Sequence, residues 1–257
     1  MTKAIFFDID GTLVSFRTHR VSPAVQAALH RLRAQGIRLF ISTGRHPQML
    51  SYIRSVFPFD GYITLSGQYC FCGDTVVRRS PMERRSVEAL VEATGDGAFS
   101  CIYLEGEELY INRVDGHTLE FMKDLDLELP PLADPARALE GELYQAVAFL
   151  TQEKEHLLLD RARGLKTTRW HPNFLDVIPD AGGKDQGMDA ILAHFHIPLE
   201  DTMAFGDGEN DLSMLVHAGI GVAMGSASEA VKSRADYVTG TVEEDGIVAA
   251  LEHFGVL

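Results

Sequence analysis

Cysteine is scarce in this sequence, with three residues among 257. Cys70, Cys72 and Cys101 do not form the paired pattern of a zinc site, and three thiols cannot all pair within one chain. We therefore expect buried or inert thiols, and a small secreted scaffold held together by disulfides is a poor interpretation.

Long apolar runs are also missing. An apolar run near the N-terminus extends only to Phe7 before acidic residues follow, so the long apolar region of a signal peptide is lacking. No stretch approaches the roughly 20 apolar residues that are needed to span a bilayer. We expect no membrane partner, and the cytoplasm is the expected location.

Positive charge is the third shortage. The chain has 23 Lys and Arg against 37 Asp and Glu, which gives a formal net charge of -14. Binding to a nucleic-acid backbone normally requires clustered Lys and Arg, so nucleic acid is a poor candidate partner. A small phosphate is not excluded, because a metal ion and a few local cations can reverse the field inside a cleft.

What the sequence does contain is the alternation of apolar strands and helices. A nearly continuous apolar run from Lys3 to Ile9 is typical of a parallel strand that helices cover on both faces. Ser22-Pro23 predicts the start of a helix that stops at Gly36, and a second strand follows over residues 37–42. These elements form a βαβ unit, whose crossover is expected to be right-handed.

The middle third differs from the two ends in the order of its predicted strands and helices. Further helices are expected over 48–56, 86–94, 118–125, 188–195, 211–217, 229–233 and 246–254, and further strands over 61–65, 99–104, 108–111, 144–150, 203–206 and 219–224. Strands and helices alternate regularly only in the first and last thirds. We therefore predict an α/β fold: a doubly wound parallel-sheet (Rossmann-like) core from residues 1–80 and 183–257, interrupted by an α+β insertion over residues 81–182.

Two carboxylates follow the first strand, in Asp8-Ile9-Asp10-Gly11-Thr12. Strand residues two apart point to the same side, so both acids can face one cleft at the carboxyl edge of the sheet. Leaving both ionised calls for a cation or a shared proton, and magnesium is the hard ion that fits best. Taken alone, the motif also fits a solvated turn.

Ser42-Thr43-Gly44-Arg45 follows the second strand, where a hydroxyl and backbone N–H groups can hold phosphate oxygens. Lys184 follows a glycine pair and begins a helix. A fixed ammonium beside clustered carboxylates can keep a nucleophile ionised and neutralise a transferring phosphoryl group. Each motif alone is also ordinary: a strand-to-loop turn and a surface lysine.

A second acidic turn follows a later strand, in the segment 205–211. Asp207 can complete a metal site begun by Asp8, while Asn210 and Asp211 can orient Lys184 or a metal-bound water. A calcium loop is excluded, because its sixth position is Leu212 instead of glycine and its twelfth is Ala218 instead of glutamate.

These four motifs, in this order, resemble the haloacid dehalogenase-like superfamily, and the Thr43-Gly44-Arg45 form with a long insertion resembles its Cof-type subfamily with a large α/β cap. The resemblance implies a nucleophile at Asp8, a general acid/base at Asp10 and charge stabilisation by Lys184. Other roles follow from it for two sets of residues. Thr43, Gly44, Arg45, Lys184 and Asn210 are expected to bind the phosphate or substrate. Asp8, the backbone carbonyl of Asp10, and Asp207 are expected to hold magnesium, with Asp211 beside them.

The resemblance implies a magnesium-dependent phosphatase that acts on a small phosphorylated metabolite through an aspartyl-phosphate. A dehalogenase has no use for Asp10 or Asp207. A phosphotransferase or phosphomutase shares the first half-reaction and stays open. A non-catalytic ligand-binding module is expected to have lost one of these acids or Lys184, and all are present.

The substrate is less defined by the sequence. A sugar phosphate is the first choice, with pyridoxal phosphate or a flavin phosphate behind it, by family analogy. Ser66-Gly67 stands where the subfamily often has Asn-Gly, which puts one substrate-loop contact in doubt. Arg45 and His46 are placed to reach the leaving group. The segment Arg169-Trp170-His171 with Asn173 is placed to face a sugar or a ring, although core packing is the stronger interpretation of Trp170. The oligomeric state is not readable from the sequence.

Overall fold

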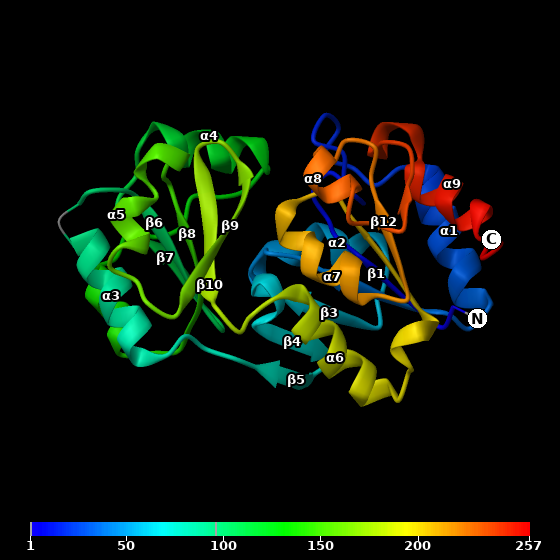
Figure 1. The fold of residues 1–257 in the computed structure, drawn as a ribbon, viewed down its shortest axis with the longest axis horizontal. Coiled ribbons are helices and arrows are strands. Elements are labelled where there is room, and N and C mark those ends of the chain that lie inside the picture. The colour runs from blue at the N-terminus through cyan, green and yellow to red at the C-terminus, as the bar shows by residue number, and fades with distance from the viewer. Residues whose placement is uncertain (1, 96) are drawn as a thin grey trace.

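The computed structural model of the chain describes residues 2–95 and 97–257. These residues form two β-sheets with their helices, which lie side by side along the longest axis of the molecule, and both termini lie on the same one of the two units (Figure 1). We call the sheets the larger sheet and the smaller sheet. The predicted α/β fold class is confirmed.

The larger sheet has the strand order β13-β12-β11-β1-β2-β3-β4-β5. Its strands are β1 (Ala4–Phe7), β2 (Arg38–Ser42), β3 (Gly61–Thr64), β4 (Tyr69–Cys72), β5 (Thr75–Arg79), β11 (Thr202–Gly206), β12 (Ile220–Ala223) and β13 (Tyr237–Val238). The strands from β13 to β3 are parallel, and β4 and β5 add an antiparallel hairpin at one edge. This hairpin was not among the predicted elements.

Helices cover both faces of the larger sheet. They are α1 (Pro23–Ala34), α2 (Ser51–Val56), α6 (Lys184–Phe195), α7 (Leu212–His217), α8 (Glu229–Lys232) and α9 (Gly246–His253). Phe7 packs in one apolar cluster with residues of α1, α2 and α9, whereas Phe6 packs in another with residues of α6, α7 and α8. The alternation of side chains along β1 thus explains why its whole apolar run is buried.

The start of α1 follows the predicted signal. The hydroxyl of Ser22 accepts a hydrogen bond from the backbone N–H of Val25 at 3.1 Å, and Pro23 is the first helical residue. Short 3₁₀ helices lie at Pro47–Leu50, Leu65–Gly67, Pro135–Leu139, Gln152–Lys154, Leu199–Asp201, Glu209–Asp211 and Val242–Glu244.

The smaller sheet is antiparallel and has the order β7-β6-β8-β10-β9. Its elements are α3 (Arg84–Gly95), β6 (Cys101–Glu105), β7 (Leu109–Ile111), α4 (Gly116–Asp124), β8 (Leu143–Ala148), α5 (His156–Leu159), β9 (Leu165–His171) and β10 (Phe174–Pro179). The apolar residues of α3 and α4 belong to different clusters, so these helices cover opposite faces of the sheet. Strands β9 and β10 were not among the predicted elements.

Residues 80–83 and 180–183 connect the two sheets, because β5 ends at Arg79 and α6 begins at Lys184. No helix among the described residues is both long and apolar enough to cross a membrane.

Candidate active site

The ends of three neighbouring strands create the site. Phe7 of β1 is level with Phe205 of β11 on one side and with Ile41 of β2 on the other. The residues that follow these strands therefore meet at one edge of the larger sheet, as in other parallel sheets. Asp8 and Thr43 are both buried there.

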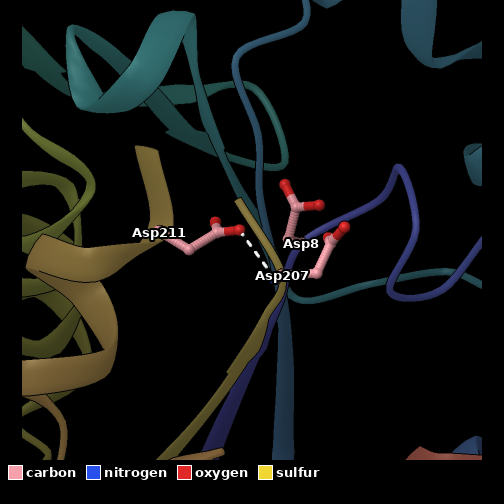
Figure 2. A group of neighbouring side chains, drawn as sticks. All are labelled: Asp8, Asp207 and Asp211. Atoms are coloured by element: carbon pink, nitrogen blue, oxygen red, sulfur yellow. Dashed lines mark hydrogen bonds between the residues drawn. The ribbon is translucent and has the colours of Figure 1, made fainter. Parts of the chain in front are cut away.

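Three aspartates converge at this edge. Figure 2 shows the carboxylates of Asp8 and Asp207 side by side at the strand ends, with Asp211 approaching from the turn before α7. One oxygen of each lies within 4.8 Å of the others. The structure thus brings together the acids that were expected to surround a metal ion.

Lys184 reaches this group as the first residue of α6. Its side chain is completely buried, and its Nζ lies 2.7 Å from Oδ1 of Asp8 and 2.5 Å from Oδ1 of Asp211. Burial acts to lower the pKa of Lys184, but the two carboxylates raise it above its ordinary value. The ammonium is therefore a permanent positive charge beside the expected nucleophile.

The start of α6 comes this close because two glycines touch. Gly67 has a positive φ of 94°, and a Cβ built on it would lie 1.9 Å from the carbonyl oxygen of Gly183. Any larger residue at Gly67 would therefore push away the backbone that carries Lys184. Ser66-Gly67, which departs from the common Asn-Gly, thus packs against the start of α6.

Asp211 organises the turn after β11. Its Oδ2 accepts hydrogen bonds from the backbone N–H groups of Asp207 and Gly208, at 3.0 and 2.9 Å, while its Oδ1 accepts from Lys184. Both oxygens are therefore occupied in the described conformation. This arrangement makes Asp211 a residue that positions its neighbours and supports the metal site from beside it.

The charge of the cluster favours a bound cation. Burial, followed by the charge of Asp211, raises the pKa of Asp8 well above its ordinary value, and the same two causes raise the pKa of Asp207 to about 7. One ammonium does not balance three carboxylates, of which Asp8 and Asp211 are buried and Asp207 is half-buried. Oxygen donors that carry unbalanced negative charge are the donor set of a hard divalent ion, so these residues fit magnesium.

Asp207 is also held from the side of the first motif. The hydroxyl of Thr12 donates to its Oδ1 at 2.9 Å. Gly11 lies against its other oxygen: φ at this glycine is 81°, and a Cβ built there would lie 2.3 Å from Oδ2. The DGT sequence after Asp8 and Ile9 is therefore required by close packing against Asp207 as well as by the turn itself.

The loop after β2 carries Thr43 and Arg45. The backbone N–H of Arg45 donates to the hydroxyl oxygen of Thr43 at 3.1 Å, which leaves the Thr43 hydroxyl hydrogen to donate to a ligand. The guanidinium of Arg45, which was expected to contact the substrate, instead binds both oxygens of Asp10. In this conformation Arg45 holds the expected acid/base.

His46 connects the two sheets. It is completely buried, its Nδ1 accepts from the backbone N–H of Gln48 at 3.2 Å, and its Nε2 lies 2.9 Å from the carbonyl oxygen of Glu105 in the smaller-sheet unit. Nε2 must therefore carry the proton and donate. Burial lowers the pKa of His46 to about 4, so the ring stays neutral and its two nitrogens are used for structure.

A cavity of about 470 Å³ opens between the edge of the larger sheet and one face of the smaller sheet. On the larger-sheet side its lining includes Asp8, Asp10, Thr43, Gly44, Arg45, Asp207, Asn210 and Asp211. The predicted site residues thus share one cavity, apart from Lys184, which contacts the site through Asp8 and Asp211. A cavity of this size suits a small ligand.

The expected substrate contacts of the insertion have structural partners. Arg169 pairs with Glu155 at 2.7 Å and donates to carbonyl groups of the β9–β10 turn. His171 stacks on Phe174 with ring centroids 4.6 Å apart, and the amide of Asn173 donates to Glu120. The side chain of Trp170 lies outside the described part of the structure.

Two polar residues of the smaller sheet also line the cavity, Gln145 and Asp176, and neither was predicted from the sequence. The amide nitrogen of Gln145 donates to the carbonyl oxygen of Gly44 at 3.1 Å. Gln145 lies in the strand LYQAVA and Asp176 in the strand FLDVIP, and the other residues of both strands are mainly apolar. Both strands are buried, except for the half-buried proline that ends the second. That pattern is the signal that was available in the sequence.

Comparison with known proteins adds independent information. The sequence model of the haloacid dehalogenase-like hydrolases matches residues 5–251. A putative phosphatase, YkrA of Bacillus subtilis (strain 168), is 31% identical and is aligned over 100% of this chain and 99% of its own length. The pyridoxal phosphate phosphatase YbhA of Escherichia coli (strain K12) is 28% identical, with 96% of each chain covered. A solved structure of BT4131, described as a sugar phosphatase of subclass IIB, has a TM-score of 0.94 and 41% identity, with both chains covered completely.

Proposed function

Because the chain belongs to the haloacid dehalogenase-like hydrolases, we propose that it is a magnesium-dependent phosphatase that forms an aspartyl-phosphate on Asp8. The observation that carries this proposal is the contact of Asp8 with the buried ammonium of Lys184, at 2.7 Å, on the floor of the cavity. Lys184 acts to lower the pKa of Asp8 against burial and the charge of Asp211, which raise it, so this contact favours the ionised carboxylate that serves as the nucleophile.

The first half-reaction uses the residues around this contact. Asp8 attacks the phosphorus atom, the ester P–O bond breaks, and the leaving oxygen takes a proton from Asp10. The hydroxyl of Thr43 and the nearby backbone N–H groups bind the phosphoryl oxygens, and Lys184 offsets the negative charge. Protonation of the leaving group requires Asp10 to exchange its contact with Arg45 for one with the ester oxygen.

The second half-reaction reverses the role of Asp10. As a carboxylate it accepts a proton from water, whose oxygen attacks the phosphorus atom. The P–O bond to Asp8 then breaks, which releases inorganic phosphate and restores the carboxylate. When bound, magnesium supplies positive charge to the phosphoryl oxygens, and Asp8, Asp207 and the backbone carbonyl of Asp10 would hold it beside Asp211.

The unit that contains the smaller sheet completes the site. We propose residues 81–182 as a cap domain on a core of residues 1–80 and 183–257. The hydrogen bonds from His46 to Glu105 and from Gln145 to Gly44 join cap and core over the cavity. A closed cap keeps bulk water from the phosphoaspartate until the leaving group has departed.

The test is release of inorganic phosphate from p-nitrophenyl phosphate and from a panel of small phosphorylated metabolites. We expect release with magnesium, none after EDTA, recovery when magnesium is added back, and none from Asp8→Asn. Asp74→Asn is the matched control, because Asp74 is exposed in the β4–β5 turn. Full activity in EDTA would contradict the metal requirement, and full activity of Asp8→Asn would contradict the nucleophile.

A further inference from the structure

Three consecutive residues after β3 have a left-handed backbone. The φ angles of Leu65, Ser66 and Gly67 are 51°, 51° and 94°, and all three residues are buried. A leucine or a serine in this region is uncommon and unfavourable, because its Cβ crowds the backbone. Such a conformation persists only where the surrounding contacts hold it, and it is frequent at functional sites. We call these three residues the left-handed turn.

The left-handed turn holds the phosphate-binding loop through backbone hydrogen bonds. The N–H of Ser66 donates to the carbonyl oxygen of Thr43 at 3.1 Å, and the N–H of Leu65 donates to that of Arg45 at 3.3 Å. The N–H of Thr43 donates to the carbonyl oxygen of Ile63, which precedes the turn, at 2.8 Å. The position of the Thr43 hydroxyl therefore depends on this turn.

The same turn supports the start of α6. Gly67 packs directly on the backbone of Gly183, which precedes Lys184. The carbonyl oxygen of Gly67 accepts a hydrogen bond from Nε of Arg78 at 3.0 Å, which fixes the turn from the other side. A shift of the left-handed turn would therefore move both the phosphate-binding loop and the buried ammonium.

Leu65 connects the turn to the cap. Its side chain is completely buried in an apolar cluster, and the other buried members of that cluster, among the residues that the structure describes, all belong to the cap: Ile102, Leu104, Ile111, Phe121, Met122, Leu125, Tyr144, Val147, Phe149 and Phe174. Strand β8 of the cap lies beside the turn, and Gln145 of this strand donates to the carbonyl oxygen of Gly44 at 3.1 Å. The cap thus contacts the phosphate-binding loop directly through Gln145 and indirectly through Leu65.

We propose that Leu65 is a positioning residue for the phosphatase reaction. Burial of its side chain among apolar residues of the cap offsets the cost of its left-handed backbone. The turn that is held in this way fixes Thr43 and Lys184 around the phosphoryl group. The proposal rests on the phosphatase activity proposed above, and it adds to that activity a residue that is not among the residues of the cavity lining.

Leu65→Ala removes the contact with the cap and tests the proposal. With p-nitrophenyl phosphate and magnesium, we expect kcat to fall by about 10- to 100-fold, since a displacement of about 1 Å at the reacting groups has an effect of this size. Calorimetric titration with inorganic phosphate and magnesium should show about ten-fold weaker binding, because the donors of the loop are misplaced. Leu65→Met keeps the volume and the apolar contact, so it should restore most of both values.

Met122→Ala is the matched control. Met122 lies on α4, is buried in the same apolar cluster and is not among the residues of the cavity lining. Its truncation also leaves a cavity in the cap, so it should lower the melting temperature about as much as Leu65→Ala does. It should leave kcat and the affinity for inorganic phosphate close to those of the wild type.

Leu65→Gly separates the side chain from the backbone strain. Glycine adopts the left-handed conformation without steric cost, so this variant should melt at a higher temperature than Leu65→Ala. It should nevertheless lose as much kcat, because the contact with the cap is absent in both. It also keeps the test valid if Leu65→Ala does not fold.

The possible outcomes separate this proposal from the proposed function. Wild-type kcat and phosphate affinity in Leu65→Gly, or equal losses in Met122→Ala, would overturn the positioning role and leave the phosphatase intact. No hydrolysis by the wild type, with a phosphate affinity that still depends on Leu65, would overturn the proposed function alone. Neither hydrolysis nor phosphate binding by the wild type would overturn both.

Discussion

Arg45 donates two hydrogen bonds to Asp10, from Nε at 2.8 Å and from Nη2 at 2.6 Å. The two residues belong to the loops that follow β2 and β1, and both side chains are largely buried. A bidentate pair of this kind fixes direction as well as distance. The general acid/base is thus held in place by a residue of the phosphate-binding loop.

Arg45→Ala is therefore expected to lower kcat by about 10- to 100-fold, because Asp10 loses the contact that aims it. Arg45→Lys is expected to recover part of this loss, since a lysine offers one directed hydrogen bond in place of the fork. Steady-state kinetics with p-nitrophenyl phosphate measures both values. A rise in KM with kcat unchanged would show instead that Arg45 serves mainly to bind substrate.

Lys184→Met is expected to lower the free energy of unfolding by about 3 kcal/mol or more, because Asp8 and Asp211 stay buried without their cation. Lys184 has a pKa raised above its ordinary 10.5, so its contribution is present at neutral pH and is lost only as the pH rises beyond that value. Urea unfolding in EDTA at neutral pH measures the loss.

Lys232→Met is the matched control for this prediction. Lys232 forms a pair with Glu229 at 3.3 Å on the surface of α8, and such pairs contribute about 0–1 kcal/mol. Equal unfolding free energies for the two methionine variants would mean that Lys184 does not stabilise the carboxylate cluster.

The raised pKa of Asp207 predicts a pH-dependent stability of the metal-free protein. Its pKa is about 7 in the folded chain against an ordinary 3.8. When the pH lies between these two values, Asp207 therefore holds a proton in the folded state that it has lost in the unfolded state. The stability from this group therefore falls as the pH rises from about 4 to about 7, by up to roughly 4 kcal/mol. Asp207→Asn removes the effect and keeps an acceptor for Thr12.

In EDTA, Asp207→Asn should thus gain stability over wild type as the pH rises through this range, and urea unfolding at a series of pH values measures the difference. Magnesium at about pH 8 should reverse the order, because only the wild type offers the carboxylate to the ion. A difference in unfolding free energy between the two proteins that does not change with pH would contradict the raised pKa of Asp207.

Three residues of the site were predictable because each one directly follows a strand. Asp8, Thr43 and Asp207 each come directly after an apolar strand, and parallel strands deliver such residues to one edge. Lys184 was predictable as the start of a helix after two glycines. Contacts that depend on loop conformation, such as Arg45 with Asp10, leave no periodic signal in the sequence.

The missed elements have different causes. Gly73-Asp74 separates β4 from β5 and is a hairpin signal that was available but was not used. Pro172-Asn173 joins β9 to β10. The residues around it were interpreted as substrate contacts or, more strongly, as core packing and a half-exposed loop, and a hairpin was not considered. Gln145 meets Gly44 across 101 positions, so its role depends on which face of the smaller sheet turns toward the core.

Gly11→Ala is expected to impair the site more than the fold. Gly11 and Gly36 both have positive φ, but a Cβ at Gly36 meets no atom within 4 Å, whereas one at Gly11 meets Asp207 at 2.3 Å. Both substitutions should cost about 1 kcal/mol of stability from backbone strain. Only Gly11→Ala should also raise the magnesium concentration for half-maximal phosphate release. The same magnesium dependence in both variants would contradict the packing argument.

Detection of a phosphoryl group on Asp8 tests the proposed mechanism most directly. Wild-type protein is mixed with p-nitrophenyl phosphate and magnesium, quenched in acid within one turnover, digested and mapped by mass spectrometry, with Asp8→Asn treated in parallel. One phosphorylated peptide, containing Asp8, is expected in the wild type and none in the variant. Phosphate release without a phosphorylated Asp8 peptide, or a phosphoryl group on another residue, would contradict it.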